Sequence, residues 1–220
     1  MRQFFRALAK AGIFVGIGLV IVKYRLLGSC PASGEEFRPI KEADMPKGFP
    51  AYTAVGQIEV KHYPAYRKAT TSGMGEFWTL FEHIKQNNVT MTAPVEMDYG
   101  DPQAAKSKER SMSFLYERPD QGSSGKQGSV EVIDVPAMAV VSIGCRGERT
   151  AKTITEARDK LVKWLDAKQR DYVSAGPMRV MGYNSPFVPR DRNFFEVQIP
   201  VKSTAPSTAG ATSDRQSHGK

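Results

Sequence analysis

The sequence predicts an α+β fold: tandem pseudo-symmetric β-β-α-β-β repeats forming an eight-stranded antiparallel distorted barrel with two helices. Three observations lead to this prediction. Residues 75–97 show an amphipathic helical pattern followed by a strand, a nine-residue segment recurs 72 positions later, and the same order of elements follows both copies. One helix on four strands cannot bury both faces of its sheet, so we expect the two halves to join.

The recurring segment reads IEVKHYPAY at 58–66 and VEVIDVPAM at 130–138. After each copy we expect a second strand, a turn with glycine, a helix and two further strands. One short match could arise by chance, but a shared order of elements favours duplication. The expected elements of the half 52–117 are strands at 66–71, 90–99 and 110–117, and those of the half 130–201 are strands at 138–143, 178–184 and 193–201, with a helix at 153–168.

The first helix is the element next to which we expect a binding site. Its apolar residues fall at i, i+3, i+4 and i+7, which is one stripe of an α-helix: Phe77, Leu80, Phe81 and Ile84. The pair Asn87-Asn88 should end it, because asparagine tolerates the left-handed conformation. In the strand that follows, Pro94 removes a hydrogen-bond donor, which is typical of an edge strand or a bulge beside a site.

The N-terminus predicts attachment to a membrane. Residues 1–30 combine five basic side chains and no acidic one with an apolar run at 11–22. That run is shorter than the about 20 residues of a spanning helix and has the length of a signal-peptide core. A signal-anchor helix and a lipoprotein signal cleaved before Cys30 both remain open. The positive charge before the run favours an extracytoplasmic domain.

The remaining organisation follows from composition. Residues 31–51 lack periodicity and contain proline, glycine and charges, so we expect a linker before a domain at 52–202. The tail 203–220 is rich in small and polar residues and should be disordered. Residues 31–201 hold 23 basic and 22 acidic side chains, so the net charge of +8 resides mainly at the termini. A nucleic-acid-binding domain would carry that charge itself, so we expect no nucleic-acid partner.

Enzymatic motifs are absent. The chain has no P-loop, HExxH, CxxC or GxSxG pattern, and Cys145 lies in an apolar strand pattern that predicts a buried thiol. The carboxylates Glu96 and Asp98 alternate on one strand face, which is common on surfaces. We therefore regard catalysis as the weaker alternative and expect no catalytic residues.

Four segments together resemble the SOUL haem-binding family: IEVKHYPAYRKAT at 58–70, MTAPVEM at 91–97, VEVIDVPAMAVVSIGCRG at 130–147 and GYNSPFVPRDRNFFEVQIPV at 182–201. The resemblance covers 55–201. It implies the eight-stranded distorted barrel with two helices and reversible, non-covalent binding of haem or another tetrapyrrole on the apolar surface near the first helix. The alternative is a membrane-tethered interaction module, or a binder of small apolar ligands, that uses the same cleft without haem.

A reversible haem site needs an apolar platform, cations for the two propionates and, in some cases, an axial ligand. We expect the platform around the first helix and the next strand, with contacts from Met74, Phe77, Phe81, Met91 and Met97. Phe77 and Phe81 also suit an ordinary core position. The candidate cations for the propionates are Lys61, Arg67, Lys68 and Lys85.

The candidate iron ligands are His62 and His83, since His218 belongs to the tail. The second copy carries Asp134 at the place of His62, so the fold does not require an imidazole there. His83 lies about 110° from the centre of the helix stripe, which predicts a sideways orientation toward solvent or a groove. Binding without a protein ligand to iron remains open.

Overall fold

The computed structural model describes residues 37–73, 76–104 and 108–204. The expected membrane segment, Met74 and most of the expected tail lie outside these ranges. Among the residues described, no helix is long and apolar enough to cross a membrane. The elements in chain order are β1 (Ile58–Tyr63), β2 (Tyr66–Thr71), α1 (Glu76–Gln86), β3 (Val95–Gly100), β4 (Ser111–Leu115), β5 (Gly125–Gln127), β6 (Val130–Val135), β7 (Met138–Arg146), α2 (Ala151–Ala167), β8 (Tyr172–Ser174), β9 (Met178–Gly182), the 3₁₀ helix η1 (Arg190–Arg192) and β10 (Phe194–Ser203).

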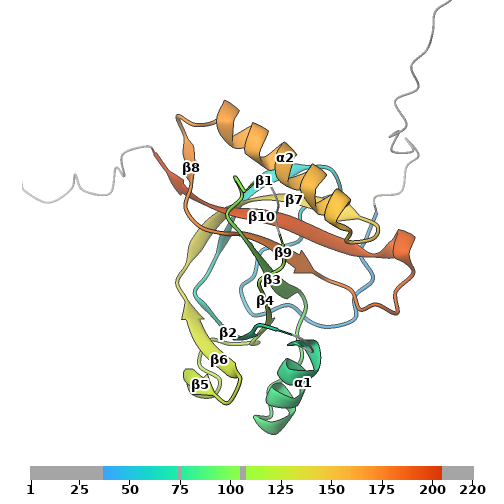
Figure 1. Cartoon of the computed structure of the whole chain (residues 1–220), viewed down its shortest axis with the longest axis vertical. Helices are drawn as coiled ribbons and strands as arrows, with labels where there is room; N and C mark the ends of the chain where they lie inside the picture. The colour runs from blue at the N-terminus through green and yellow to red at the C-terminus, as the bar shows by residue number, and fades with distance from the viewer. Residues whose placement is uncertain (1–36, 74–75, 105–107, 205–220) are drawn as a thin grey trace, which may run out of the picture. The chain divides into compact units, whose positions relative to one another are not determined.

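All ten strands belong to one antiparallel sheet in the order β1-β7-β10-β9-β3-β4-β2-β6-β5, with β8 on β10 (Figure 1). The α+β class is therefore confirmed. The end strands β1 and β5 do not pair with each other in this part of the chain, so the sheet is open where a barrel was expected. The physical reason is the added strand β5, which forms a hairpin with β6 and takes the edge that closure would need.

The strand registers agree with the 72-residue offset. Tyr63 pairs with Met138 across β1 and β7, while Tyr66 pairs with Val135 across β2 and β6. Adding 72 to one member of the first pair and subtracting it from the other gives the second pair. The neighbouring pairs β2–β4 and β7–β10 correspond in order, but their second strands are 85 residues apart (Ala69 pairs with Phe114, Val141 with Ile199), so the 72-residue offset does not extend to them. The registers of β1–β7 and β2–β6 support the duplication, which stays a hypothesis about origin.

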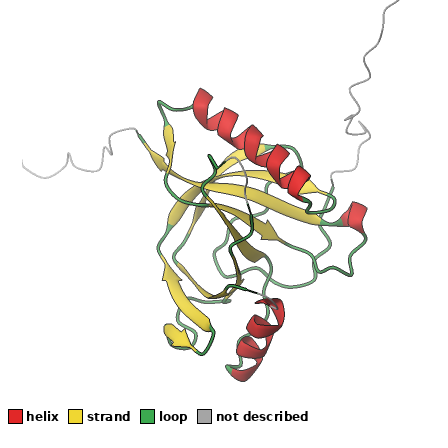
Figure 2. Ribbon diagram, viewed as in Figure 1, coloured by secondary structure: helices red, strands yellow, loops and turns green. Residues whose placement is uncertain are grey.

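Both helices pack on the same face of the sheet, which we call the helix face (Figure 2). α1 covers β2, β4 and β6, and α2 covers β7 and β10. In α1, Leu80 and Ile84 are buried as the stripe predicts, and Asn88 just beyond its end has φ of 51°. Pro94 directly precedes β3, which lies between β9 and β4, so the strand after α1 is central and begins beyond the proline.

Residues 37–55, which we call the strap, cover the opposite face of the sheet and were expected as a linker for most of their length. Phe49 packs edge-on against Tyr63 and Tyr66, with ring centroids 4.9 and 5.3 Å apart. Gly144 lets the strap approach β7, because a Cβ atom there would lie 2.1 Å from the carbonyl oxygen of Thr53. The strap therefore contributes to the core through aromatic residues whose irregular spacing shows no periodicity.

A network of charged side chains is buried beneath the strap. The ammonium of Lys61 donates to both carboxylate oxygens of Glu196, at 2.9 and 3.0 Å. Glu96 accepts hydrogen bonds from Lys68, from Tyr66 and from Arg179. Burial alone would raise the pKa of Glu96, but the neighbouring cations of Arg179 and Lys68 hold it below its ordinary value. Glu96 thus stays charged and fixes strands β2, β3 and β9 to one another.

Candidate functional site

A groove on the helix face is lined by residues of β3 and β4, by the turn that precedes α2 and by the loop between β9 and β10, in the part of the sheet between the strands covered by α1 and those covered by α2. Its floor is formed by Met97 and Tyr99 of β3 and Met112 of β4, and its volume is about 370 Å³. Met97 and Met112 are direct partners across the two strands, so their side chains lie next to each other. Met112 packs against the cores under both helices. We call this hollow the interhelical groove.

The N-terminal end of α1 borders the groove. Phe77 packs edge-on against Phe114, with ring centroids 5.2 Å apart, and Phe114 follows the floor residue Met112 by two positions on the same face of β4. At the first residue of the helix, Glu76 is hydrogen-bonded to Glu109, which itself lines the groove. The apolar surface under α1 therefore continues into the groove floor.

Arg149 supplies a cation at the groove. Its Nη1 lies 2.8 Å from Sδ of Met97, and the residue directly precedes Thr150, the N-cap of α2. Gly182 of β9 makes this position accessible, because a Cβ atom there would lie 2.6 Å from Nη1 of Arg149. The guanidinium thus lies over the backbone of β9 and against the apolar floor, where an anionic group of a bound molecule would meet it.

Two acidic groups of the groove are shifted toward their neutral forms. Burial, followed by the charge of Glu76, raises the pKa of Glu109. Burial and the charge of Glu109 raise the pKa of Tyr99 to about 12. Tyr99 is therefore a neutral phenol at physiological pH, and the floor carries no phenolate.

Exposed aromatic side chains gather on α1 and on the loop between β9 and β10. Phe77, Trp78 and Phe81 are 37%, 67% and 39% exposed, and their rings contact one another at centroid distances of 5.4 to 6.2 Å. Phe187 is 95% exposed, and its neighbours Pro186 and Val188 line the groove. Solvent-exposed aromatic clusters of this kind indicate a binding surface.

The structure places the predicted contact residues in several locations. Met97 forms the floor of the groove, Phe77 borders it, and Phe81 and Lys85 are exposed on α1. Met91 lines a different hollow, on the strap side of the sheet.

The predicted cations have other partners. Lys61 is buried with Glu196, and Lys68 is paired with Glu96, both under the strap. Arg67 makes a two-pronged ion pair with Asp134 through Nε and Nη2, at 2.7 and 3.0 Å. Lys61 is therefore not a free cation in this structure, because its ammonium neutralises a buried carboxylate.

Neither candidate histidine lies in the groove. His62 is exposed on β1, the strand at the edge of the sheet. His83 is buried, with Nε2 2.9 Å from the hydroxyl of Tyr116, and this burial lowers its pKa. The expected sideways orientation of His83 toward solvent is corrected accordingly. Within the described ranges, no group of three or more histidine, cysteine, aspartate or glutamate side chains could hold a metal ion.

Three groove residues, Tyr99, Met112 and Arg149, were not foreseen from the sequence, and neither were the exposed aromatic residues Trp78 and Phe187 outside the groove. The position of Met112 could have been predicted, because β4 follows β3 as an antiparallel partner and carries a methionine near its start. For Arg149 the sequence contains no such signal. The residue belongs to the turn between β7 and α2, and the position of this turn depends on how both elements pack in the folded domain. Cys145, predicted as a buried thiol, is a half-buried free cysteine, and the burial that it has raises its pKa to about 12.

The protein is a two-helix antiparallel α+β domain with a groove on its helix face that combines methionine side chains with the cation of Arg149 and several polar side chains. The family model described as SOUL heme-binding protein matches residues 49–200, so the chain belongs to that family. A comparison with curated proteins gives no match.

Solved structures share the fold. The crystal structure of the EcmrR C-terminal domain is 19% identical, with a TM-score of 0.51, and the match covers 66% of this chain and 97% of that one. The cryo-EM structure of an EcmrR–DNA complex matches with 17% identity and a TM-score of 0.51, over 66% of this chain and 57% of that one. A hydrolase encoded by lin2189 from Listeria innocua matches at 12% identity with a TM-score of 0.48, over 67% and 93%. At these identities the likeness to the two EcmrR structures concerns the fold alone.

Proposed function

We propose that this protein binds haem or a related tetrapyrrole non-covalently and reversibly in the interhelical groove. The observation that carries the proposal is the half-buried Met112 in the groove floor, beside the 2% exposed Met97 and the guanidinium of Arg149. Thioethers are polarizable and adaptable, which suits a flat apolar ring held without close fit. The guanidinium suits a propionate, which it can bind through two parallel hydrogen bonds.

The chemistry of the groove favours a platform for the macrocycle over a histidine bond to iron. Met112 and the exposed aromatic rings of α1 would hold the ring by apolar contact, the buried Met97 would support Met112 from below, and Arg149 would orient the carboxylates. Haem, when bound, would supply a redox-active iron. No histidine of the described ranges lines the groove, and Tyr99 holds its proton because its pKa is raised. Affinity should then depend mainly on the porphyrin ring and its propionates.

We further propose that the domain works at a membrane surface, attached through residues 1–30 and on the extracytoplasmic side. The support is the basic start and the apolar run at 11–22, both of which lie outside the described residues. A carrier, buffer or sensor of haem would fit this attachment. Fractionation of cells that express the full chain, with protease accessibility of the domain, tests the attachment separately from ligand binding.

The experiment for the ligand is a titration of the full chain with haemin, followed at the Soret band, beside a titration with metal-free protoporphyrin. We expect saturation at one equivalent for both, with dissociation constants within about tenfold of each other, since the iron adds little to the contacts. A protein that bound haemin but not protoporphyrin would contradict the platform. Saturation by neither would contradict tetrapyrrole binding altogether.

A further inference from the structure

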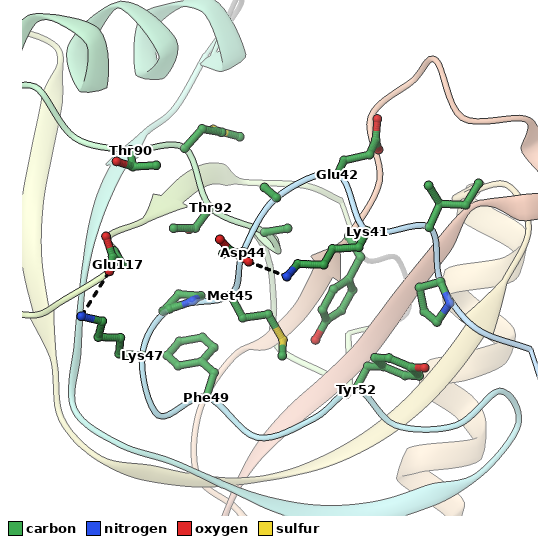
Figure 3. A pocket seen from close by; sticks show the side chains of 17 residues that line it. Lys41, Glu42, Asp44, Met45, Lys47, Phe49, Tyr52, Thr90, Thr92 and Glu117 are labelled. Carbon is green, nitrogen blue, oxygen red and sulfur yellow. Dashed lines mark ion pairs between the residues drawn. The ribbon is translucent and has the colours of Figure 1, made fainter.

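A second hollow lies on the strap side of the sheet and shares no lining residue with the interhelical groove. Its volume is about 630 Å³, within the range of small-molecule sites. The strap contributes Ile40, Met45 and Phe49 to its lining, and other segments contribute Met91, which follows α1, and Tyr183, which follows β9. Figure 3 shows Met45 and Phe49 of the strap together with Thr90 and Thr92 of the segment after α1. We call this hollow the strap cavity. Most of its strap wall, 39–48, precedes the residues matched by the family model.

Large apolar side chains in the lining expose hydrocarbon surface to the cavity. Ile40 and Met45 are each 36% exposed although they are large apolar residues, and both line the cavity. Met91 and Tyr52 are half-buried in its lining. Figure 3 shows the side chains of Met45 and Phe49 gathered on one side of the hollow. Two methionines let such a site adapt to the shape of an apolar molecule.

The charged side chains of the lining are already paired with protein groups. Lys41 and Asp44 form an ion pair at 2.5 Å, and Lys47 pairs with Glu117 at 3.4 Å (Figure 3). The fifth charged residue, Glu42, accepts hydrogen bonds from the backbone nitrogen and the hydroxyl of Ser185, both at 2.7 Å. An ionic ligand would have to break one of these pairs and would gain little, so the lining favours a neutral molecule.

The strap wall is fixed in place by the backbone. The amide of Lys47 donates to the carbonyl of Glu117 at 2.9 Å, and the amide of Ala93 donates to the carbonyl of Asp44 at 2.9 Å. Nδ2 of Asn184 donates to the carbonyl of Ile40 at 2.7 Å. A ligand would therefore enter a preformed site and would not have to order the strap, which favours binding.

From these four features we infer that the strap cavity binds a neutral, largely hydrocarbon molecule, at a site separate from the tetrapyrrole groove. The class includes long-chain alcohols and similar uncharged lipids. Haem does not fit this class, because its two propionates would need free cations that the paired lysines do not offer. The inference does not depend on haem binding, since the two hollows share no residue.

The test is photolabelling of the full chain with a long-chain 1-alkanol that carries a diazirine in its hydrocarbon tail. Peptide mass spectrometry then locates the labelled residues. We expect labels in 39–52 and 90–93, displaced by the unlabelled alkanol at about tenfold lower concentration than by the alkanoate or alkyltrimethylammonium of equal length. Labels spread evenly over the chain, confined to the groove, or displaced equally well by the charged analogues would overturn the inference.

Two matched variants sharpen the test. Met91→Trp fills the strap cavity, and Met112→Trp makes the same change at a half-buried methionine of the groove. We expect Met91→Trp to lower labelling of 39–52 about tenfold and Met112→Trp to leave it unchanged. Met45→Trp, at a more exposed cavity position, provides a second filled variant if Met91→Trp folds poorly. Equal labelling of the parent chain and of a folded cavity-filled variant would refute the site.

Discussion

The guanidinium of Arg149 lies against the sulfur of Met97, with Nη1 2.8 Å from Sδ, although the two residues are 52 positions apart in the chain. The contact places a permanent positive charge at the edge of an apolar floor. Gly182 permits it by leaving space above β9. The contact between Arg149 and Met97 brings together an apolar surface and a positive charge. A tetrapyrrole with propionates needs both, and no single residue of α1 supplies both.

Removing the charge of Arg149 should weaken haemin binding. We expect Arg149→Gln to raise the dissociation constant about tenfold, because a hydrogen bond to a charged group contributes about 1.5–3 kcal/mol and part of it is screened in an open groove. A Soret titration measures the change. The control is Arg118→Gln, which removes an exposed arginine paired with Asp120 and should bind as the parent does. Equal affinities for both variants would remove Arg149 from the site.

Lys61 should matter for stability and not for the ligand. Lys61→Met leaves Glu196 buried without its cation, and we expect a loss of about 3–5 kcal/mol in the free energy of unfolding. Urea denaturation measures this loss. Lys152→Met, which removes an exposed lysine 4.0 Å from Glu156, should change the free energy by less than about 0.5 kcal/mol. A Lys61→Met protein as stable as the parent would contradict the buried pair.

His83 predicts a pH dependence of stability. Burial lowers its pKa below the ordinary value of 6.5, so the unfolded chain takes up a proton at higher pH than the folded one. The free energy of unfolding should therefore fall as the pH drops from about 6.5 toward the lowered pKa, by at most about 1.4 kcal/mol per pH unit.

His83→Gln isolates this contribution, because the amide still offers Tyr116 a polar partner but does not titrate. Urea unfolding of parent and variant between pH 7 and pH 5 gives the difference directly. The parent should lose more stability than the variant over this interval. Parallel pH profiles would mean that His83 is accessible to protons in the folded state.

The strap should contribute to the stability of the domain. Phe49→Ala removes a ring packed on Tyr63 and Tyr66, and we expect a loss of about 2–4 kcal/mol. The matched change Phe187→Ala, at a ring that is 95% exposed, should alter the free energy by less than about 0.5 kcal/mol. Thermal unfolding monitored by circular dichroism compares them. Equal melting temperatures for the two variants would show that the strap does not stabilise the sheet.

The sequence predicted those parts of the fold that depend on local pattern. The stripe of α1 foretold the burial of Leu80 and Ile84, and Asn88 has the left-handed conformation expected at the end of the helix. The registers of β1–β7 and β2–β6 agree with the 72-residue offset, while the duplication itself stays a hypothesis. Phe77 and Phe81 suited both a core and a ligand-facing position, and the structure leaves each more than a third exposed.

Other features depend on residues far apart in the chain. Lys61 has the alternation of a surface lysine, and only Glu196, 135 positions away, determines that it is buried. The strap shows no periodicity in its sequence, because it forms neither a helix nor a strand. Its aromatic side chains pack between side chains that project from the sheet. The sheet remains open because of β5, a three-residue strand with little apolar pattern. Such long-range partners are not visible in a single sequence.

The most direct test of the central claim is a haemin titration of Met112→Trp beside Met91→Trp. Each variant replaces a half-buried methionine by the larger tryptophan. Met112 lies in the interhelical groove, whereas Met91 lies in the strap cavity. We predict that Met112→Trp raises the haemin dissociation constant at least about tenfold, while Met91→Trp saturates like the parent chain. Normal binding by Met112→Trp together with impaired binding by Met91→Trp would place the tetrapyrrole in the strap cavity and contradict the account.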